Sequence, residues 1–413
     1  MLTRLLVGAS LACCAAYPDL LIRDVTVIDV SSGTTFPNRS ILIRGDRIAE
    51  VGAGIAAPKD TPNFNGAGKY VIPGFWDMHV HLGDKEQLQT YLAYGITGVR
   101  DMGSDFGAVK LWRDAIQQGL AFGPHIETSG PAFDGFPADS NVPVQMVREP
   151  NQARALFDRV DQQGVDFISV FPRLPRDVYF ALAERARKYY SSVSGPVPAS
   201  VSVLEAIDAR QKSVDRMSGV LLGCSTEEKK LLPIRSLALE RRDTEGFREA
   251  EIAAMNTFSP EKARALFQRM ALYGTRAVPM LVALRASAYQ KALYDMLVRL
   301  LLQMQVAGVS ILAGTDAGLD DVHPGESLHS ELELLVAAGL TPAEALRSAT
   351  LEPANYLDAG ESLGAIEPGK LADLVLLNAN PLTDIRNTRK IYRVIRGGLV
   401  CDPQALLGTS PKN

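Results

Sequence analysis

The chain is poor in cysteine and has no excess of positive charge. Only four cysteines occur in 413 residues and two of them are adjacent, so disulfides cannot form the scaffold of the fold. The 43 basic and 47 acidic side chains give a formal net charge of −4, which offers no positive field to a nucleic-acid backbone. We therefore expect no nucleic-acid partner. With 46% hydrophobic and 22% charged residues, the chain can fold around a large packed core.

Long apolar runs are also missing, apart from one short run at the N-terminus. Residues 5–16 form this run, with Arg4 before it and small residues at its end, which is typical of a secretory signal peptide. About a dozen residues are too few to span a bilayer, which takes about 20. We predict a signal peptide at residues 1–16, a periplasmic or secreted mature protein and no membrane span. The alternatives are a buried N-terminal strand or helix, and lipidation at Cys13.

The two ends of the chain differ in pattern from its middle. Short β-branched runs separated by Gly and Asp turns lie between residues 25 and 52, and similar runs recur at residues 374–377 and 391–398. In the middle, apolar runs followed by helical stretches repeat about eight times, which favours a (β/α)8 TIM barrel over a doubly wound sheet. The prediction is an α/β fold with a barrel at 73–362, a small β-sandwich domain at 17–72 plus 363–405, and a tail at 406–413. The charged stretch 224–256 is predicted as a helical excursion over the barrel mouth.

The strongest chemical signal lies between Pro73 and His81. Because side chains alternate between the faces of a strand, His79 and His81 share a face about 7 Å apart along the strand, close enough to hold one ion. Asp316 follows the last predicted barrel strand, so its carboxylate belongs to the same rim, where such barrels place their active sites. Two imidazoles and a carboxylate suit zinc, iron or manganese, and Asp316 would act as the catalytic proton acceptor. The alternative is a purely structural histidine pair.

These motifs resemble the amidohydrolase superfamily, specifically its imidazolonepropionase-like, exported dipeptidase-type branch. The resemblance covers essentially the whole chain and rests on four segments: Pro-Gly-x-x-Asp-x-His-x-His at 73–81, Gly-Thr-Asp-Ala-Gly at 314–318, residues 343–354, and the return toward the β domain at 363–375. It implies a (β/α)8 barrel with a β-sandwich and one or two divalent metals. It also implies hydrolysis of a carbon–nitrogen bond in a small substrate, such as a dipeptide or a cyclic amide.

Three of the metal ligands that the resemblance implies are absent. Ser169 occupies the position of a carboxylated lysine on the fourth barrel strand, and Pro196 and Arg216 occupy the positions of histidines on the fifth and sixth. Proline has no side-chain donor atom and arginine stays protonated, so neither can replace a ligand. We predict that Arg216 pairs with Asp316 and takes part of the space and charge of the lost metals. At best one weakly held divalent ion, zinc by preference, is left on the two histidines and Asp316, and the site can also be metal-free.

Three residues are candidates for substrate binding: Arg216, His329 and Ser169. Arg216 would polarise a substrate carbonyl. His329 matches a family position close behind Asp316, so it either supports Asp316 or packs within its helix. Two functions stay open, a metal-dependent hydrolase with an incomplete site and impaired activity, or a catalytically inactive protein that binds a small molecule on the same fold. The sequence is compatible with either a monomer or an oligomer.

Overall fold

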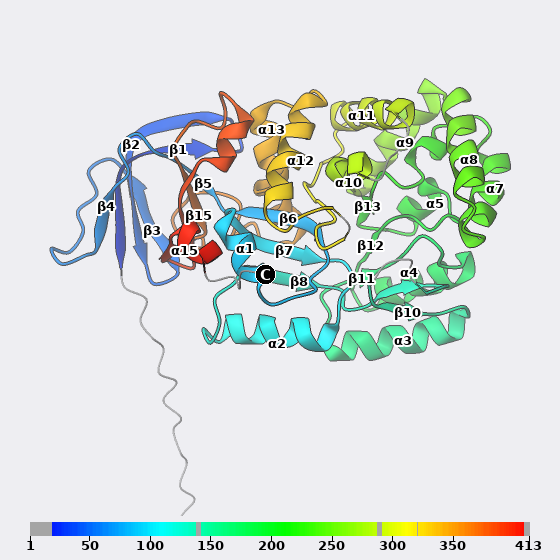
Figure 1. The fold of residues 1–413 in the computed structure, drawn as a ribbon, viewed down its shortest axis with the longest axis horizontal. Helices are drawn as coiled ribbons and strands as arrows, with labels where there is room; N and C mark the ends of the chain where they lie inside the picture. The colour runs from blue at the N-terminus through cyan, green and yellow to red at the C-terminus, as the bar shows by residue number, and fades with distance from the viewer. Residues whose placement is uncertain (1–18, 138–141, 287–290, 320, 409–413) are drawn as a thin grey trace, which may run out of the picture.

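The computed structural model describes residues 19–137, 142–286, 291–319 and 321–408. The predicted signal peptide and the last five residues of the predicted tail lie outside this part of the chain. Figure 1 shows two parts side by side: a β-rich part built from both ends of the chain, and a larger part in which helices surround parallel strands. No helix of the described residues is both long and apolar enough to cross a bilayer.

The β-rich part is one eight-stranded sheet that both chain ends share. Its strands are β1 (Leu20–Asp29), β2 (Thr34–Arg44), β3 (Arg47–Gly52), β4 (Asn63–Asn65), β5 (Tyr70–Pro73), β15 (Leu374–Leu377), β16 (Ile391–Arg396) and β17 (Leu399–Cys401). The order is β17-β16-β15-β5-β1-β2-β3, with β4 paired to β1. The two ends meet where β5 and β15 run antiparallel, with Val71 opposite Leu376. Because these strands form a single hydrogen-bonded sheet, its division into two packed layers stays a prediction.

Parallel strands form two further sheets in the middle of the chain. The first contains β6 (Phe75–Val80), β7 (Ile96–Asp101) and β8 (His125–Thr128), and the second contains β11 (Ile168–Ser169), β12 (Val193–Gly195), β13 (Ser213–Asp215) and β14 (Arg276–Val278). A short parallel pair, β9 (Ala132–Asp134) and β10 (Val144–Met146), lies near them, and a bridge between Phe133 and Val170 links β9 to the second sheet. The described strands thus form an α/β fold, but not one continuous closed sheet.

Residues 310–317 lie between the two parallel sheets. Ile311 forms a parallel bridge with Ala277 of β14, and Ala317 forms one with Val80 of β6. The backbone N–H of Asp316 donates to the carbonyl of His79 at 2.8 Å. This pairing brings the segment that carries Asp316 directly against the strand that carries the histidines.

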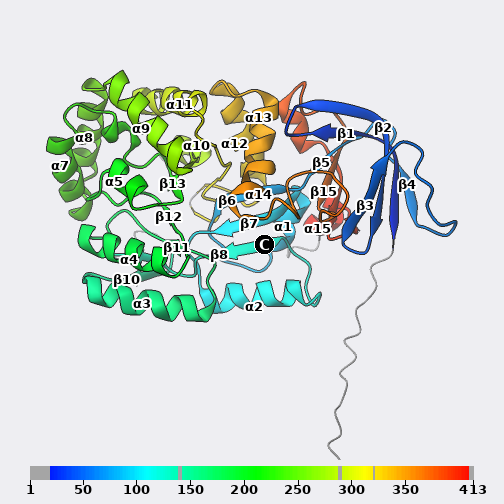
Figure 2. The ribbon, with the colours of Figure 1, turned by 180° about the vertical axis from the view of Figure 1, so that it is seen from behind.

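Helices follow the parallel strands and cover them. They are α1 (Gln87–Ala93), α2 (Phe106–Gln117), α3 (Pro150–Gln163), α4 (Arg176–Lys188), α5 (Val203–Asp208), α6 (Val220–Gly223), α7 (Glu228–Glu240), α8 (Thr244–Asn256), α9 (Pro260–Tyr273), α10 (Leu281–Ala286), α11 (Lys291–Val306), α12 (Glu326–Ala337), α13 (Pro342–Ser348) and α14 (Leu351–Tyr356). From behind, α2 and α3 lie on one side of the strands, whereas α11, α12 and α13 lie on the other (Figure 2). A short 3-10 helix, η1 (Ile385–Arg389), and α15 (Pro403–Gly408) complete the elements.

The helix ends follow from local sequence. In α9, the Ser259 side chain accepts from the backbone N–H of Lys262, Pro260 occupies the first turn, and Gly274 ends the helix with a φ of 67°. These are the residues that favour helix starts and stops, because they satisfy the unpaired end groups or allow a left-handed backbone. The predicted excursion at 224–256 is indeed helical, since it contains α7 and α8. Both helices lie at the end of the molecule toward which β7 and β8 point (Figure 1).

Candidate metal centre

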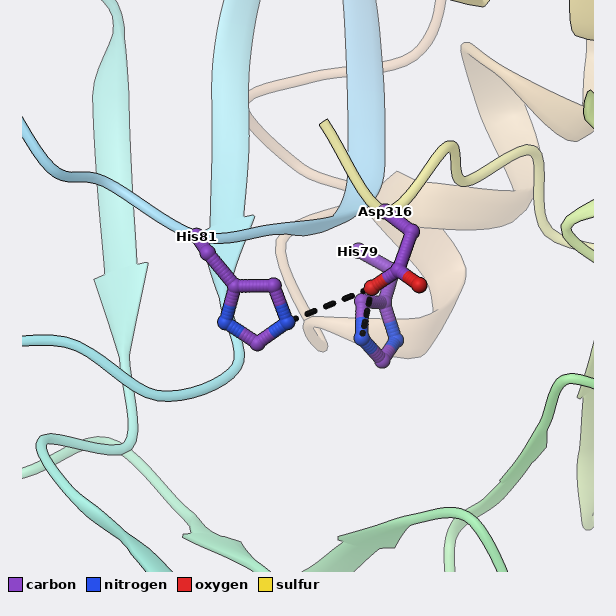
Figure 3. A group of neighbouring side chains, drawn as sticks. All are labelled: His79, His81 and Asp316. Carbon is purple, nitrogen blue, oxygen red and sulfur yellow. Dashed lines mark ion pairs between the residues drawn. The ribbon is translucent and has the colours of Figure 1, made fainter. Parts of the chain in front are cut away.

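The structure brings His79, His81 and Asp316 together at the end of β6. The Nε2 atoms of His79 and His81 lie 3.3 Å and 3.2 Å from the same carboxylate oxygen, Oδ1 of Asp316. The three side chains converge in Figure 3, and at most 6% of any of them is exposed. They form the one group of three or more His, Cys, Asp or Glu residues, within the described part of the chain, whose ligand atoms are close enough to share an ion.

The spacing and chemistry of these donor atoms fit a single divalent ion. Ligand atoms about 2.0–2.1 Å from a tetrahedral zinc ion lie about 3.3 Å from one another. The separations of Asp316 Oδ1 from His79 Nε2 and from His81 Nε2, 3.3 Å and 3.2 Å, are close to that edge length, and the ligand atoms of the three residues all lie within 4.8 Å of one another. Imidazole nitrogen and carboxylate oxygen are ligands that zinc, iron and manganese all accept. The three residues therefore suffice to hold one ion, with further coordination positions left open.

The backbone around Asp316 is shaped to present its carboxylate. Asp316 has a φ of 70°, in the left-handed region that non-glycine residues seldom adopt. Two residues later, Gly318 has a φ of 100°, and a Cβ on it would lie 2.1 Å from the carbonyl oxygen of His81. Only glycine can occupy that position. Strained backbone of this kind is typical of functional sites, where the surrounding contacts hold it in place.

Each histidine is oriented by a hydrogen bond on the far side of its ring. His79 Nδ1 lies 2.6 Å from Oδ2 of Asp215, and His81 Nδ1 lies 3.0 Å from the carbonyl oxygen of Gly103. Carbonyl oxygens and ionised carboxylates only accept hydrogen bonds, so both rings donate from Nδ1 and turn Nε2 toward Asp316. No sequence motif singled out Asp215, which lies against His79 in the structure. The signal available was its position on β13, one residue before Arg216 and on the same strand face as Ser213.

Arg216 occupies the other side of the Asp316 carboxylate. Its NH2 atom lies 3.1 Å from Oδ2, so the ion pair predicted from the sequence is present. Burial raises the pKa of the Asp316 carboxyl, but Arg216 and the two histidines lower it more, and the pKa lies well below its usual range. The Arg216 side chain is 40% exposed, which leaves part of the guanidinium open to solvent. A ligand entering the site can therefore reach it.

Ser169 and Pro196 occupy the other two positions where the resemblance implies a metal ligand. Ser169 is fully buried, and its hydroxyl finds no hydrogen-bond partner among the described residues. Pro196 is buried just after β12 and has no side-chain donor. Neither histidine nor a carboxylate stands at these two positions or at position 216, so these three positions add no such ligand for a second ion. Whether Ser169 contacts a substrate stays a prediction.

Two buried acids near the site brace the loops that carry it. Asp77 accepts hydrogen bonds from the backbone N–H and the hydroxyl of Thr315, at 3.1 Å and 2.7 Å, and so ties β6 to the Asp316 segment. Burial raises the pKa of Asp77 to about 7. Asp101 accepts from the hydroxyls of Ser104 and Thr128. Their contacts are those of bracing residues.

His329 lies away from the three-residue cluster. Its Nε2 is 3.1 Å from the carbonyl oxygen of Tyr94 and its Nδ1 is 3.0 Å from the Thr388 hydroxyl, while its ring packs edge-on against Phe75 with centroids 5.7 Å apart. Among the described residues no hydrogen bond or ion pair joins it to Asp316. This placement corrects the expectation of a residue beside Asp316 or in contact with substrate, and it agrees with the alternative of packing within the helix. The reason is that the face of α12 carrying His329 turns toward Tyr94 and η1.

His329 should make the protein less stable in mild acid. Burial, with a smaller effect of Arg389, lowers its pKa from 6.5 to about 4. A histidine with a depressed folded-state pKa contributes stability that is present above pH 6.5 and is lost as the pH falls toward 4, because only the unfolded state accepts the proton readily. A shift of this size corresponds to about 3 kcal/mol. Urea unfolding at pH 7 and pH 4 should show this loss in the wild type and a much smaller loss in His329→Gln.

The matched control for this experiment is His323→Gln. His323 is an exposed loop residue, so the same substitution there changes the histidine count without touching a buried ring. His323→Gln should keep the pH dependence of the wild type. Equal pH dependence of all three proteins would show that the buried ring does not control stability in acid.

The chain is similar to several known proteins. The model of the amidohydrolase family matches residues 298–401. The imidazolonepropionase of Alkaliphilus metalliredigens is 25% identical, in an alignment that covers 87% of this chain and 92% of that protein. The adenine deaminase of Rubrobacter xylanophilus is 37% identical over 91 residues, which are 22% of this chain and only 15% of that protein.

A solved structure extends the likeness to the whole fold. It is a Xaa-Pro dipeptidase with bound methionine in its active site, and it superposes with a TM-score of 0.71 at 23% identity over 93% of this chain and 99% of that one. At this identity the superposition supports the fold alone. The site residues must therefore be argued from their own geometry.

Proposed function

This chain belongs to the amidohydrolase superfamily, in its imidazolonepropionase-like branch, and from that membership we propose that it is a metal-dependent hydrolase that cleaves a carbon–nitrogen bond of a small amide. The observation that carries the proposal is the convergence of His79 Nε2, His81 Nε2 and Asp316 Oδ1 on one point. The proposed substrates are a dipeptide or a cyclic amide, by analogy with a dipeptidase and an imidazolonepropionase among the similar proteins.

The proposed cofactor is one divalent ion, with zinc as the first choice. His79 and His81 would hold it through Nε2 and Asp316 through Oδ1, which lies 3.3 Å and 3.2 Å from the two nitrogens. Such an ion supplies Lewis acidity, which makes a water molecule more acidic and polarises a carbonyl group. The missing donors at positions 169, 196 and 216 support a stoichiometry of one ion per chain.

Asp316 would act as the base, and Arg216 would bind the substrate. The Asp316 carboxylate is ionised, so it can take a proton from the attacking water and pass it to the departing amine. The exposed side of the Arg216 guanidinium can bind the carbonyl oxygen, or an anionic group, of the substrate. Because Arg216 also lowers the pKa of Asp316, the carboxylate is a weak base. We therefore expect slow turnover.

A second candidate function is a catalytically inactive protein that binds a small molecule in the same site. The Arg216–Asp316 ion pair favours this candidate function. A guanidinium beside the carboxylate lowers the affinity of the site for a divalent ion and makes the carboxylate a weaker base. Under this alternative, His79, His81 and Arg216 would bind an anionic or carbonyl ligand without cleaving it.

Activity assays on single variants separate the two candidates. The purified protein, with added Zn²⁺ or Mn²⁺, is assayed on dipeptides and cyclic amides, beside His79→Ala, Asp316→Asn and the control His323→Ala. A hydrolase should lose at least about tenfold in kcat/KM in the first two variants and keep its activity in the control. Activity that survives both site substitutions would rule out the metal-dependent hydrolase. Ligand binding without any turnover in the wild type would support the inactive alternative.

The proposal also covers the closed barrel, the small β-sandwich and the export of the protein. We propose that the parallel strands and residues 310–317 form the closed (β/α)8 barrel of the superfamily, with the sheet of the chain ends as its small β-sandwich. The parallel bridges on either side of residues 310–317 support that view. We also propose export, with cleavage after the signal peptide at residues 1–16, to the periplasm or the medium.

A further inference from the structure

A buried carboxylate, Asp215, lies directly behind the ion-binding face of His79. Its Oδ2 atom is 2.6 Å from His79 Nδ1 and 2.9 Å from NH2 of Arg100, and its Oδ1 accepts a hydrogen bond from Ser213 at 2.6 Å. The side chain is completely buried. His79, Arg100 and Ser213 thus hydrogen-bond to the two oxygens of Asp215 and fix the orientation of its carboxylate.

Arg100 anchors this carboxylate from inside the fold. It is among the largest fully buried side chains, and it donates to the Met78 carbonyl at 2.7 Å and to the Tyr356 hydroxyl at 2.7 Å as well as to Asp215. Its guanidinium also lies over the Tyr356 ring, 5.0 Å from the centroid. Arg100 is always charged, so it holds Asp215 in the ionised form that can only accept hydrogen bonds.

We propose that Asp215 is a positioning residue that fixes the ring of His79 so that its Nε2 lone pair faces the ion. The inference rests on the proposed metal-dependent function and adds a residue outside the three ligands. The short contact on Nδ1 selects the tautomer with hydrogen on that atom and makes the opposite nitrogen more basic. With only three protein ligands, the site depends strongly on each of them being oriented before the ion arrives.

The chain contains a matched control for this arrangement. Asp373 is also a buried carboxylate between a histidine and an arginine, with Oδ2 2.7 Å from His125 Nε2 and Oδ1 3.5 Å from NH1 of Arg396. It immediately precedes β15, in the sheet of the chain ends. Asp373→Asn therefore removes the same kind of buried charge without touching a residue of the metal centre.

The test compares the Zn²⁺ dissociation constants of the wild type, Asp215→Asn and Asp373→Asn, measured by competition with a chromophoric chelator. Asp215→Asn should bind zinc about thirtyfold more weakly, as expected for the loss of an orienting carboxylate, whereas Asp373→Asn should match the wild type. With Co²⁺ as a second probe, the visible absorption bands should change in Asp215→Asn and not in Asp373→Asn. A merely structural carboxylate would leave that spectrum unchanged.

The outcomes separate this inference from the proposed reaction. Zinc binding in folded Asp215→Asn equal to that of the wild type overturns the inference, and so does a wild type that binds no zinc. A wild type that binds zinc but hydrolyses nothing overturns only the proposed reaction. If Asp215→Asn does not fold, Ser213→Ala replaces it, because Ser213 donates to the same carboxylate. Ser213→Ala should weaken zinc binding less but in the same direction, and unchanged binding there counts against the inference.

Discussion

Replacing Arg216 with histidine is expected to raise the affinity of the protein for Zn²⁺ about a hundredfold. The guanidinium now lies 3.1 Å from Oδ2 of Asp316, while the two histidines face Oδ1 of the same carboxylate. A cation about 6 Å from a divalent ion costs about 5 kcal/mol at an effective dielectric constant near 20, and the 40% exposure of Arg216 reduces this by screening. The substitution removes the repulsion and adds an imidazole ligand at the end of β13.

A second variant separates the two causes of the gain. Arg216→Gln removes the charge without adding a ligand, so it should bind zinc about tenfold more tightly than the wild type, and Arg216→His more tightly again. The control is Arg386→Gln, because Arg386 is 73% exposed and its substitution changes the net charge equally. Chelator competition at constant ionic strength measures all four proteins. If neither substitution at position 216 improves zinc binding, Arg216 is not what weakens the site.

The ligand cluster could be predicted from sequence because it depends on simple periodicities. His79 and His81 share a strand face whatever the rest of the fold does, since side chains alternate along a strand. The expected barrel, in which the first and last strands are neighbours, predicts that Asp316 joins them. In the structure the segment that carries Asp316 lies beside β6, where Ala317 pairs with Val80. The strand at residues 374–377 was likewise predictable, because its short apolar run coincides with the observed β15.

The buried partners of the cluster could not be predicted in the same way. Arg100 lies on β7 and Asp215 on β13, in different sheets, and their contact depends on how the interior packs. No local pattern distinguishes such an arginine from one on the surface. For His329 the sequence was misleading. The residue lies near Asp316 in the sequence, which suggested a contact between the two side chains. In the structure, the face of α12 that carries His329 is turned toward Tyr94 and η1 instead. Helical periodicity identifies a buried face but not the neighbour that covers it.

Replacing Arg100 with methionine is expected to lower the free energy of unfolding by about 4 kcal/mol. Both Arg100 and Asp215 are completely buried, so the variant leaves a carboxylate without its countercharge in an interior that cannot hydrate it. The Met78 carbonyl also loses its hydrogen-bond donor. Chemical denaturation at pH 7 measures the change, and the same substitution at the exposed Arg386 should cost less than about 1 kcal/mol.

The double variant Arg100→Met/Asp215→Leu shows whether the loss comes from the unpaired charge. If it does, removing the carboxylate as well should recover part of the stability, because replacing both members of a buried ion pair by apolar side chains costs less than breaking it. The recovered protein should still bind zinc weakly, since His79 loses the acceptor that orients it. A single variant as stable as the wild type would mean that Asp215 does not need Arg100 to stay ionised. In that case, Ser213 and His79 alone would have to hold the carboxylate in place.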